Sequence, residues 1–214
     1  MSLNKFIPRD ILIIFVLATA LNIIRVVVFE SYSFVWLFWN MFLAVIPFVI
    51  STFLFWLENK NKLNNHLFII GGIFWLLFIP NAPYIVTDFI HIGVVRAVPV
   101  LYDAFLLFSF AWVGLYLGLY SISHIDEIIR KRYSKTTAEI ILPIIIILVS
   151  FGVYLGRGLR FNSWDVFINH TSLLNHLWKI ISQATIHTEV YLYTFLISIF
   201  LYLFYKSFKY SKTK

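Results

Sequence analysis

A group of polar side chains that could do chemistry follows an apolar run interrupted by two prolines. Asp88 and His91 are three residues apart, and Tyr84 lies four residues before Asp88. If residues 83–92 are helical, these three side chains share one face. An Asp and a His one helical turn apart can exchange protons with a substrate or bind one metal ion. The spacing therefore indicates a candidate reactive face.

Polar groups that begin other apolar runs could complete this site. We expect Asp88, His91, Asp103, Arg157 and Glu189 to converge on one concave surface, because leaving such groups singly against lipid costs about 2.5–3.5 kcal/mol each. The candidate catalytic set is Asp88, His91 and Asp103, and the candidate metal set is Asp88, His91 and Glu189, with His187, His170 or Asp165 as further donors. Oxygen and imidazole ligands in a chain without cysteine suit zinc, manganese or iron.

Two arginines suggest a different chemistry. Arg157 and Arg160 are about one helical turn apart, and Arg binds carboxylate or phosphate with two hydrogen bonds. Together with Asn81 and Tyr84, they form a candidate substrate-binding set for an anionic head group. Two alternatives remain: the arginines hold ordinary lipid phosphates, or one of them pairs with Asp88 in a purely structural role.

The residues around the prolines predict a broken membrane helix. Leu67 to Ile79 covers only about 20 Å, short of a hydrocarbon core of about 30 Å. Pro80 and Pro83 then interrupt the helix, and Asn81 can cap its continuation. Lipid does not tolerate irregular backbone unless it lines a cavity or packs against protein. The break is therefore the expected position of a binding site.

Composition sets the fold class. At 61% hydrophobic and 13% charged residues, this 214-residue chain is too apolar for a soluble domain. We predict a single integral membrane domain over residues 1–214, an all-α bundle with six spans at about 11–29, 34–57, 64–79, 100–122, 138–156 and 190–206. The first run is interpreted as a span rather than a cleaved signal, because its apolar stretch is too long.

An additional helix is predicted between the last two spans. Residues 171–184 have apolar side chains at helical spacing and polar ones largely opposite, as in a helix that lies on the membrane surface. His176 falls on the polar face and is left out of the site.

The distribution of the basic residues predicts the orientation of the chain in the membrane. Twelve of the 17 Lys and Arg residues fall in segments on one side of the six spans. Four fall on the other side, namely Arg96, Arg157, Arg160 and Lys179, and Arg25 lies within the first span. The positive-inside rule places both termini in the cytoplasm. The net charge of +7 is thus a topology signal, and we expect membrane lipids, not nucleic acid, as partners. The sequence leaves the oligomeric state open.

Three features inside the spans have structural interpretations. Gly114 and Gly118, and likewise Gly152 and Gly156, are small residues four apart that favour close helix packing. Arg25 either faces a polar interior or extends along the helix to the membrane surface.

The two polar stretches resemble the signature regions of a known family. The stretch from Pro80 to Asp88 with His91, and the stretch from Gly156 to Asp165, are similar to an uncharacterised bacterial multi-span membrane family, domain of unknown function family 1361. Gly158 stands where a bulkier residue is expected. The resemblance covers essentially the whole chain and implies a protein of the bacterial cytoplasmic (inner) membrane. It implies no activity.

Three functions fit these observations. The first is binding or processing of a lipid or lipid-linked anionic substrate at the outer, extracytoplasmic face, with or without catalysis. The second is a permease component for a small anionic solute, for which polar groups should continue through the inner half of the bundle. The third is a structural accessory subunit. Metal content separates an enzyme that uses a divalent ion, such as zinc or manganese, from the others.

Overall fold

In the computed structural model, residues 9–93, 98–183 and 185–212 are described, and they form helices without strands. The helices are α1 (Arg9–Phe29), α2 (Leu37–Asn59), α3 (Asn65–Phe78), α4 (Asn81–Tyr84), η2 (Ile85–His91), α5 (Val100–Arg132), α6 (Lys135–Gly158), α7 (Asp165–Ile168), α8 (His170–Ser182) and α9 (Thr188–Lys212). Among the described residues, six helical stretches are long and apolar enough to cross a membrane, the third being residues 65–91. The prediction of an all-α, multi-pass membrane bundle with a broken third span is confirmed.

Local sequence fixes several helix ends. Apolar runs become helices because lipid offers backbone N–H and C=O groups no partners outside the segment. α3 begins after Asn64, whose side chain accepts the N–H of Leu67 at 2.8 Å. α6 begins in the same way after Ser134, and Arg160, two residues after its end at Gly158, has a φ of 59°. The N–H of Phe161 then bonds the carbonyl of Leu155 in the last turns of α6 at 3.1 Å, so the chain turns back over the end of the helix.

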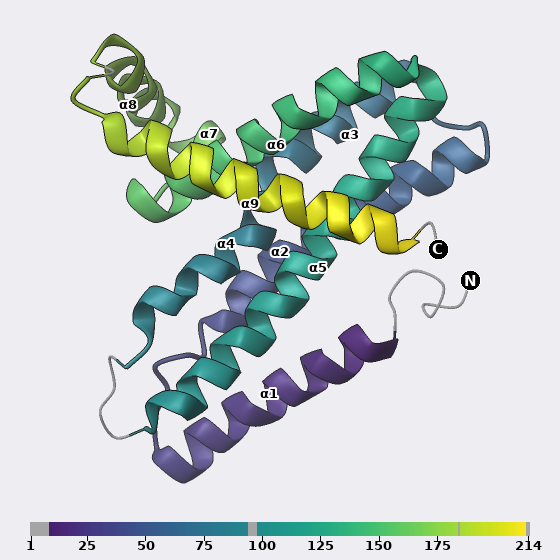
Figure 1. Cartoon of the computed structure of the whole chain (residues 1–214). Coiled ribbons are helices and arrows are strands. Elements are labelled where there is room, and N and C mark those ends of the chain that lie inside the picture. The colour runs from purple at the N-terminus through teal and green to yellow at the C-terminus, as the bar shows by residue number, and fades with distance from the viewer. Residues whose placement is uncertain (1–8, 94–97, 184, 213–214) are drawn as a thin grey trace.

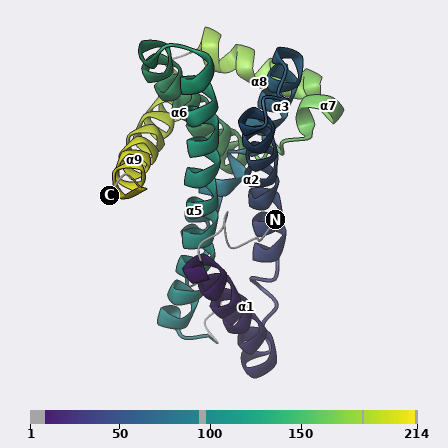
Figure 2. The ribbon, with the colours of Figure 1, turned by 90° about the vertical axis from the view of Figure 1, so that its right-hand side faces the viewer.

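α5 is the centre of the bundle. Within its apolar window 67% of residues are buried, against 22% for each of α1 and α9. α2 packs along α5, and α9 packs along α6 and crosses α5 (Figure 1). α1 packs chiefly on α5 and lies at the opposite end of the molecule from α8 (Figure 2). α1 and α9 are therefore the outer helices of the bundle.

The fourth span is longer than predicted. We expected it to end near residue 122, whereas α5 continues to Arg132 and has 33 residues. At about 1.5 Å per residue it is about 50 Å long, which exceeds the hydrocarbon core. The additional turns contain His124 and Asp126, both buried, because α2 and α9 continue to cover α5 there.

α8 is the predicted amphipathic helix, over His170–Ser182 instead of 171–184. Ile180 is buried against Tyr154 of α6, whereas Leu174, Trp178 and Ile181 are exposed. The expected end, Ala184, lies outside the described residues, as does Arg96 of the predicted outer connection. One side of α8 thus rests on the bundle and leaves a second apolar row uncovered.

Candidate functional site

Other hydrogen bonds replace the backbone hydrogen bonds that are lost at the helix break. Pro80 and Pro83 have no N–H, and the N–H of Ala82 bonds Ile79 instead of Phe78. The amide nitrogen of Asn81 donates to the freed carbonyl of Phe78 at 2.8 Å. The expectation that Asn81 caps the next helix was wrong, because Asn81 is already helical and its side chain points back to the preceding turn.

The two glycine pairs hold the broken segment between α5 and α6. A Cβ at Gly152 would come within 2.4 Å of the Pro80 ring, and one at Gly114 within 3.0 Å of the Ala82 carbonyl oxygen. Gly118 faces Ala82, and Gly156 faces the ring of Tyr84, in the same way. The close packing predicted for these glycines is therefore packing against the break, where no side chain would fit.

Arg157 of α6 reaches across to the face that carries the predicted polar residues. Its Nε donates to Thr87 Oγ1 at 2.8 Å, and its guanidinium lies 4.3 Å from the ring centroid of Tyr84. It also forms an ion pair with Asp88 and lies 3.4 Å from Nε2 of His91. Residues 85–91 form a tighter, three-residue-per-turn helix rather than an α-helix. This puts residues 84 and 87 in one row and 88 and 91 in the next, with Arg157 over both.

Asp88 is fully buried and has two partners. One carboxylate oxygen bonds Arg157, and the other accepts a hydrogen bond of 3.0 Å from the amide nitrogen of Asn40 on α2. His91 packs edge-on against Trp36, with ring centroids 5.4 Å apart. Asp88, His91 and Arg157 therefore come together as expected, and Asp88 is held in the ion pair that the structural alternative describes.

A cavity of about 270 Å³ lies beside this cluster. α2, α3, α6 and the segments after α6 form its walls, and the break closes one side. Most lining side chains are apolar, including Leu43, Phe151 and Leu173. The polar lining residues are Asn40, Asn81, Tyr84, Asn162 and Ser163. The cavity lining therefore combines apolar side chains with amide groups, the combination that an amphiphile requires.

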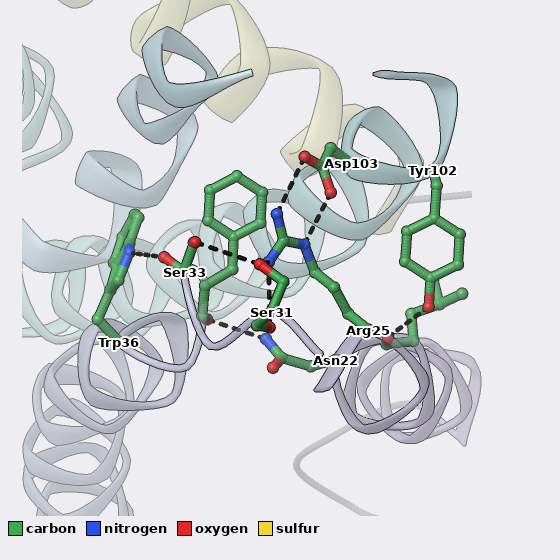
Figure 3. A network of polar contacts seen from close by, with 9 residues as sticks. Asn22, Arg25, Ser31, Ser33, Trp36, Tyr102 and Asp103 are labelled. Carbon is green, nitrogen blue, oxygen red and sulfur yellow. Dashed lines mark hydrogen bonds and ion pairs between the residues drawn. The ribbon is translucent and has the colours of Figure 1, made fainter. Parts of the chain in front are cut away.

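Asp103 belongs to a different cluster (Figure 3). Arg25 of α1 contacts both of its carboxylate oxygens, Nε at 2.8 Å and NH2 at 3.2 Å, and both side chains have no exposed surface. Arg25 also donates to Ser31 Oγ at 2.6 Å and lies over the ring of Phe34. Asp103 is thus not free to join Asp88 and His91, and Arg25 faces the protein interior rather than the membrane surface.

In the described part of the chain, none of the other candidates forms a hydrogen bond or ion pair with Asp88 or His91. Glu189, in the first turn of α9, is exposed, as are Arg160 and His170. His187 is half-buried near the start of α9. Asp165 accepts a hydrogen bond from the backbone N–H of Asn162. Among the described residues, no three His, Asp or Glu side chains are arranged to hold a metal ion. The predicted set of Asp88, His91 and Glu189 is therefore not assembled.

His176 was misplaced by the sequence interpretation. Its ring packs edge-on against Phe161, with centroids 5.4 Å apart, and Phe161 lines the cavity. The helical pattern of α8 did not show this, because apolar residues lie on two sides of the helix and the bundle covers only one of them.

Sequence analysis also missed residues that reach the cluster from other elements. Asn40 lies in a segment that carries no motif, and Ser163 was not singled out within its stretch; only the fold brings them to the break. Ser163 accepts a hydrogen bond of 2.9 Å from Asn81. The stretch from Gly156 to Asp165 had drawn attention to this loop, but not to Ser163 itself.

A second polar region on α5 was missed because the span continues beyond residue 122. The hydroxyl of Ser121 meets Ser51 and the indole N–H of Trp75, and His124 lies 3.4 Å from Ser51 Oγ. Further along α5, Asp126 accepts hydrogen bonds from three side chains, Arg130, Tyr205 and Lys209.

The comparisons with known proteins are limited to one match. The model of the family described as "Protein of unknown function (DUF1361)" matches residues 39–204, which include both stretches around the site. No curated protein and no solved structure matches the chain.

Proposed function

We propose that this chain, which belongs to the DUF1361 family of proteins of unknown function, binds or processes a lipid or lipid-linked anionic substrate. The observation that carries the proposal is the cavity of about 270 Å³ at the broken helix, which combines apolar walls with amide groups. A membrane protein has little reason to keep such polar groups beside lipid unless they receive a polar ligand.

The arginines supply the attraction for an anion. Arg157 and Arg160 flank the cavity through Gly156 and Phe161, which line it. Asp88 offsets the charge of Arg157, whose side chain is 22% exposed, so the exposed Arg160 provides the uncompensated positive charge. Tyr84 and Asn81 face the cavity as substrate-binding residues.

Catalysis, if the protein has it, would use Asp88 and His91. Both lie beside Arg157, which orients the carboxylate of Asp88 through their ion pair. We assign Asp103 a structural role, because Arg25 engages both of its oxygens.

The membrane placement belongs to the same proposal. The distribution of Lys and Arg supports an orientation with both termini in the cytoplasm and the cavity at the extracytoplasmic side of a bacterial inner membrane. The exposed row of Leu174, Trp178 and Ile181 on α8 would then insert into the outer interface.

A steric variant tests the proposal. Leu173 of α8 lines the cavity, so Leu173→Trp should fill it without touching the ion pair. Leu174→Trp is the matched control, because Leu174 is the next residue, 61% exposed and outside the cavity lining. Purified proteins are analysed by mass spectrometry for co-purified lipid and titrated with fluorescent phosphatidylglycerol.

We expect Leu173→Trp to lose bound anionic lipid and Leu174→Trp to retain it. Arg160→Gln should weaken phosphatidylglycerol binding more than binding of uncharged diacylglycerol. Equal lipid content in all four proteins would overturn the proposal, since annular lipid does not depend on one cavity residue.

One observation supports the alternative that the protein is a permease component. Polar groups continue along α2 and α5 at Ser51, Ser121 and His124, beyond the cavity. Buried Leu43 and Ala44 occupy the turn of α2 between Asn40 and this region. A permease would need these two side chains to move apart, so the binding function is favoured.

A further inference from the structure

The orientation of Asn40 is fixed by its partner. A carboxylate oxygen accepts hydrogen bonds and does not donate them, and Asp88 forms an ion pair with Arg157. The NH₂ group of Asn40 therefore points to Asp88, as the contact of 3.0 Å from Nδ2 to Oδ2 shows. The amide oxygen of Asn40 must then point away from Asp88, and Asn40 lines the cavity.

Asn81 is oriented by the same argument. The carbonyl of Phe78 only accepts, so the amide nitrogen of Asn81 faces it at 2.8 Å. The second N–H of that nitrogen reaches Ser163 Oγ at 2.9 Å. Both N–H groups are thus used within the protein, which leaves the amide oxygen of Asn81 as its remaining polar atom.

Asn40, Asn81 and Ser163 therefore offer the cavity two acceptor oxygens and one O–H donor. Within the described residues, the amide oxygens of Asn40 and Asn81 have no hydrogen-bonding partner, and neither is among the fully buried unpaired atoms. Ser163 accepts from Asn81 and so keeps its O–H to donate. The cavity lining contains no charged side chain.

We propose that this amide group of Asn40, Asn81 and Ser163 receives the uncharged, hydroxyl-rich part of a lipid head group, such as a glycerol or a sugar. Hydroxyl groups donate to the two amide oxygens and accept from Ser163, so they match every atom that these three residues leave unpaired. A phosphate only accepts and would meet the amide oxygens unfavourably. The phosphate of the same lipid would lie outside the cavity, at Arg160. The inference names the head group of the proposed substrate and therefore rests on the proposed function.

An ammonium head group is the competing donor. It fits two amide oxygens but cannot accept from Ser163, and it would lie beside a pocket rim that carries Arg157 and Arg160. The charges therefore favour hydroxyl donors over ammonium.

Five lipids with the same acyl chains separate these contributions. Phosphatidylglycerol carries both phosphate and hydroxyl groups, and monoglucosyl-diacylglycerol carries hydroxyl groups alone. Phosphatidic acid carries phosphate without glycerol or sugar hydroxyls, and the 3-O-methyl ether of diacylglycerol carries neither. Phosphatidylethanolamine supplies the ammonium group. Binding of each to the purified full-length protein is measured by native mass spectrometry, with wild type, Ser163→Ala, Arg160→Gln and, as a matched control, Ser182→Ala on the exposed side of α8.

We expect the wild type to prefer each hydroxyl-bearing lipid to its partner without hydroxyls. Ser163→Ala should reduce that preference about three- to tenfold, the worth of one hydrogen bond, and leave the phosphate preference unchanged. Arg160→Gln should do the reverse, and Ser182→Ala should do neither.

The experiment distinguishes a failure of this inference from a failure of the proposed function. Phosphate-dependent binding with no hydroxyl preference, or phosphatidylethanolamine binding as well as phosphatidylglycerol, would overturn this inference and leave the proposed function standing. Binding of none of the five lipids above a detergent-solubilised control membrane protein would overturn both.

Discussion

Arg25 of α1 and Asp103 of α5 form a fully buried ion pair with two parallel contacts, at 2.8 and 3.2 Å (Figure 3). α1 lies before residue 39, where the family match begins, and it packs chiefly on α5. The pair therefore attaches a peripheral span to the most buried one. This pair is separate from the pair of Asp88 and Arg157. It explains why Asp103, a residue of the predicted site, is absent from the cavity lining.

Removing one partner of this pair should destabilise the bundle strongly. Arg25→Met leaves Asp103 buried without a counter-charge, which costs about 3–5 kcal/mol. The melting temperature in detergent should fall clearly, and the double variant Arg25→Met/Asp103→Leu should recover much of the loss because it removes both charges. Lys135→Met, at an exposed position, is the control. A double variant no more stable than Arg25→Met would contradict the assignment.

Asp88→Asn separates chemistry from structure at the broken helix. A catalytic carboxylate predicts a folded protein that has lost its function. The contacts of Asp88 with Arg157 and Asn40 indicate instead that the variant will also lose stability, by up to about 3–5 kcal/mol, because Arg157 keeps a partly buried charge. Thermal unfolding and bound lipid are measured together.

The charge-free pair Asp88→Asn/Arg157→Gln provides the control for that experiment. If the ion pair only supports the fold, the double variant should regain stability and bind phosphatidylglycerol. Restored stability without lipid binding would instead place one of the two side chains in contact with the ligand.

Gly152 should tolerate no larger side chain. In Gly152→Ala the new Cβ would lie 2.4 Å from the Pro80 ring, which is rigid, so α6 must move away from the break. Overpacking of this kind costs about 1–3 kcal/mol. Gly72→Ala is the matched control, because its Cβ would meet no atom within 4 Å. Equal melting temperatures of the two variants would show that the break does not pack against α6 as described.

The orientation in the membrane can be tested directly, since the chain has no cysteine. In intact bacterial cells, a membrane-impermeant maleimide should label Lys179→Cys on α8 but not Lys60→Cys after α2, two exposed positions on opposite predicted sides. A reporter fused after Lys214 should be active only in the cytoplasm. Labelling of Lys60→Cys alone would invert the topology and place the cavity inside.

The fold class followed from the sequence alone. Six apolar runs, two prolines after a short third run and the glycine pairs were sufficient to predict six spans, the break and close packing. Each of these depends on local chemistry: lipid forces the backbone to bond within a segment, proline lacks an N–H, and glycine lacks a Cβ.

The choice of partners was decided by tertiary structure. Asp88, Asp103, Arg25 and Arg157 were all visible as costly charges, but either aspartate could have paired with either arginine. The pairing follows from which helices touch, α1 with α5 and α6 with the broken segment, and a sequence pattern does not contain that information.

The cavity depended on tertiary structure in the same way. Asn40 and Ser163 are ordinary polar residues in their own segments, and they become a site only because α2 and the segment after α6 meet at the break. His124 and Asp126 lay beyond the predicted end of the fourth span, near residue 122. Both residues are part of α5, because neighbouring helices supply hydrogen bonds and rings that offset their burial, and that compensation exists only in the folded bundle.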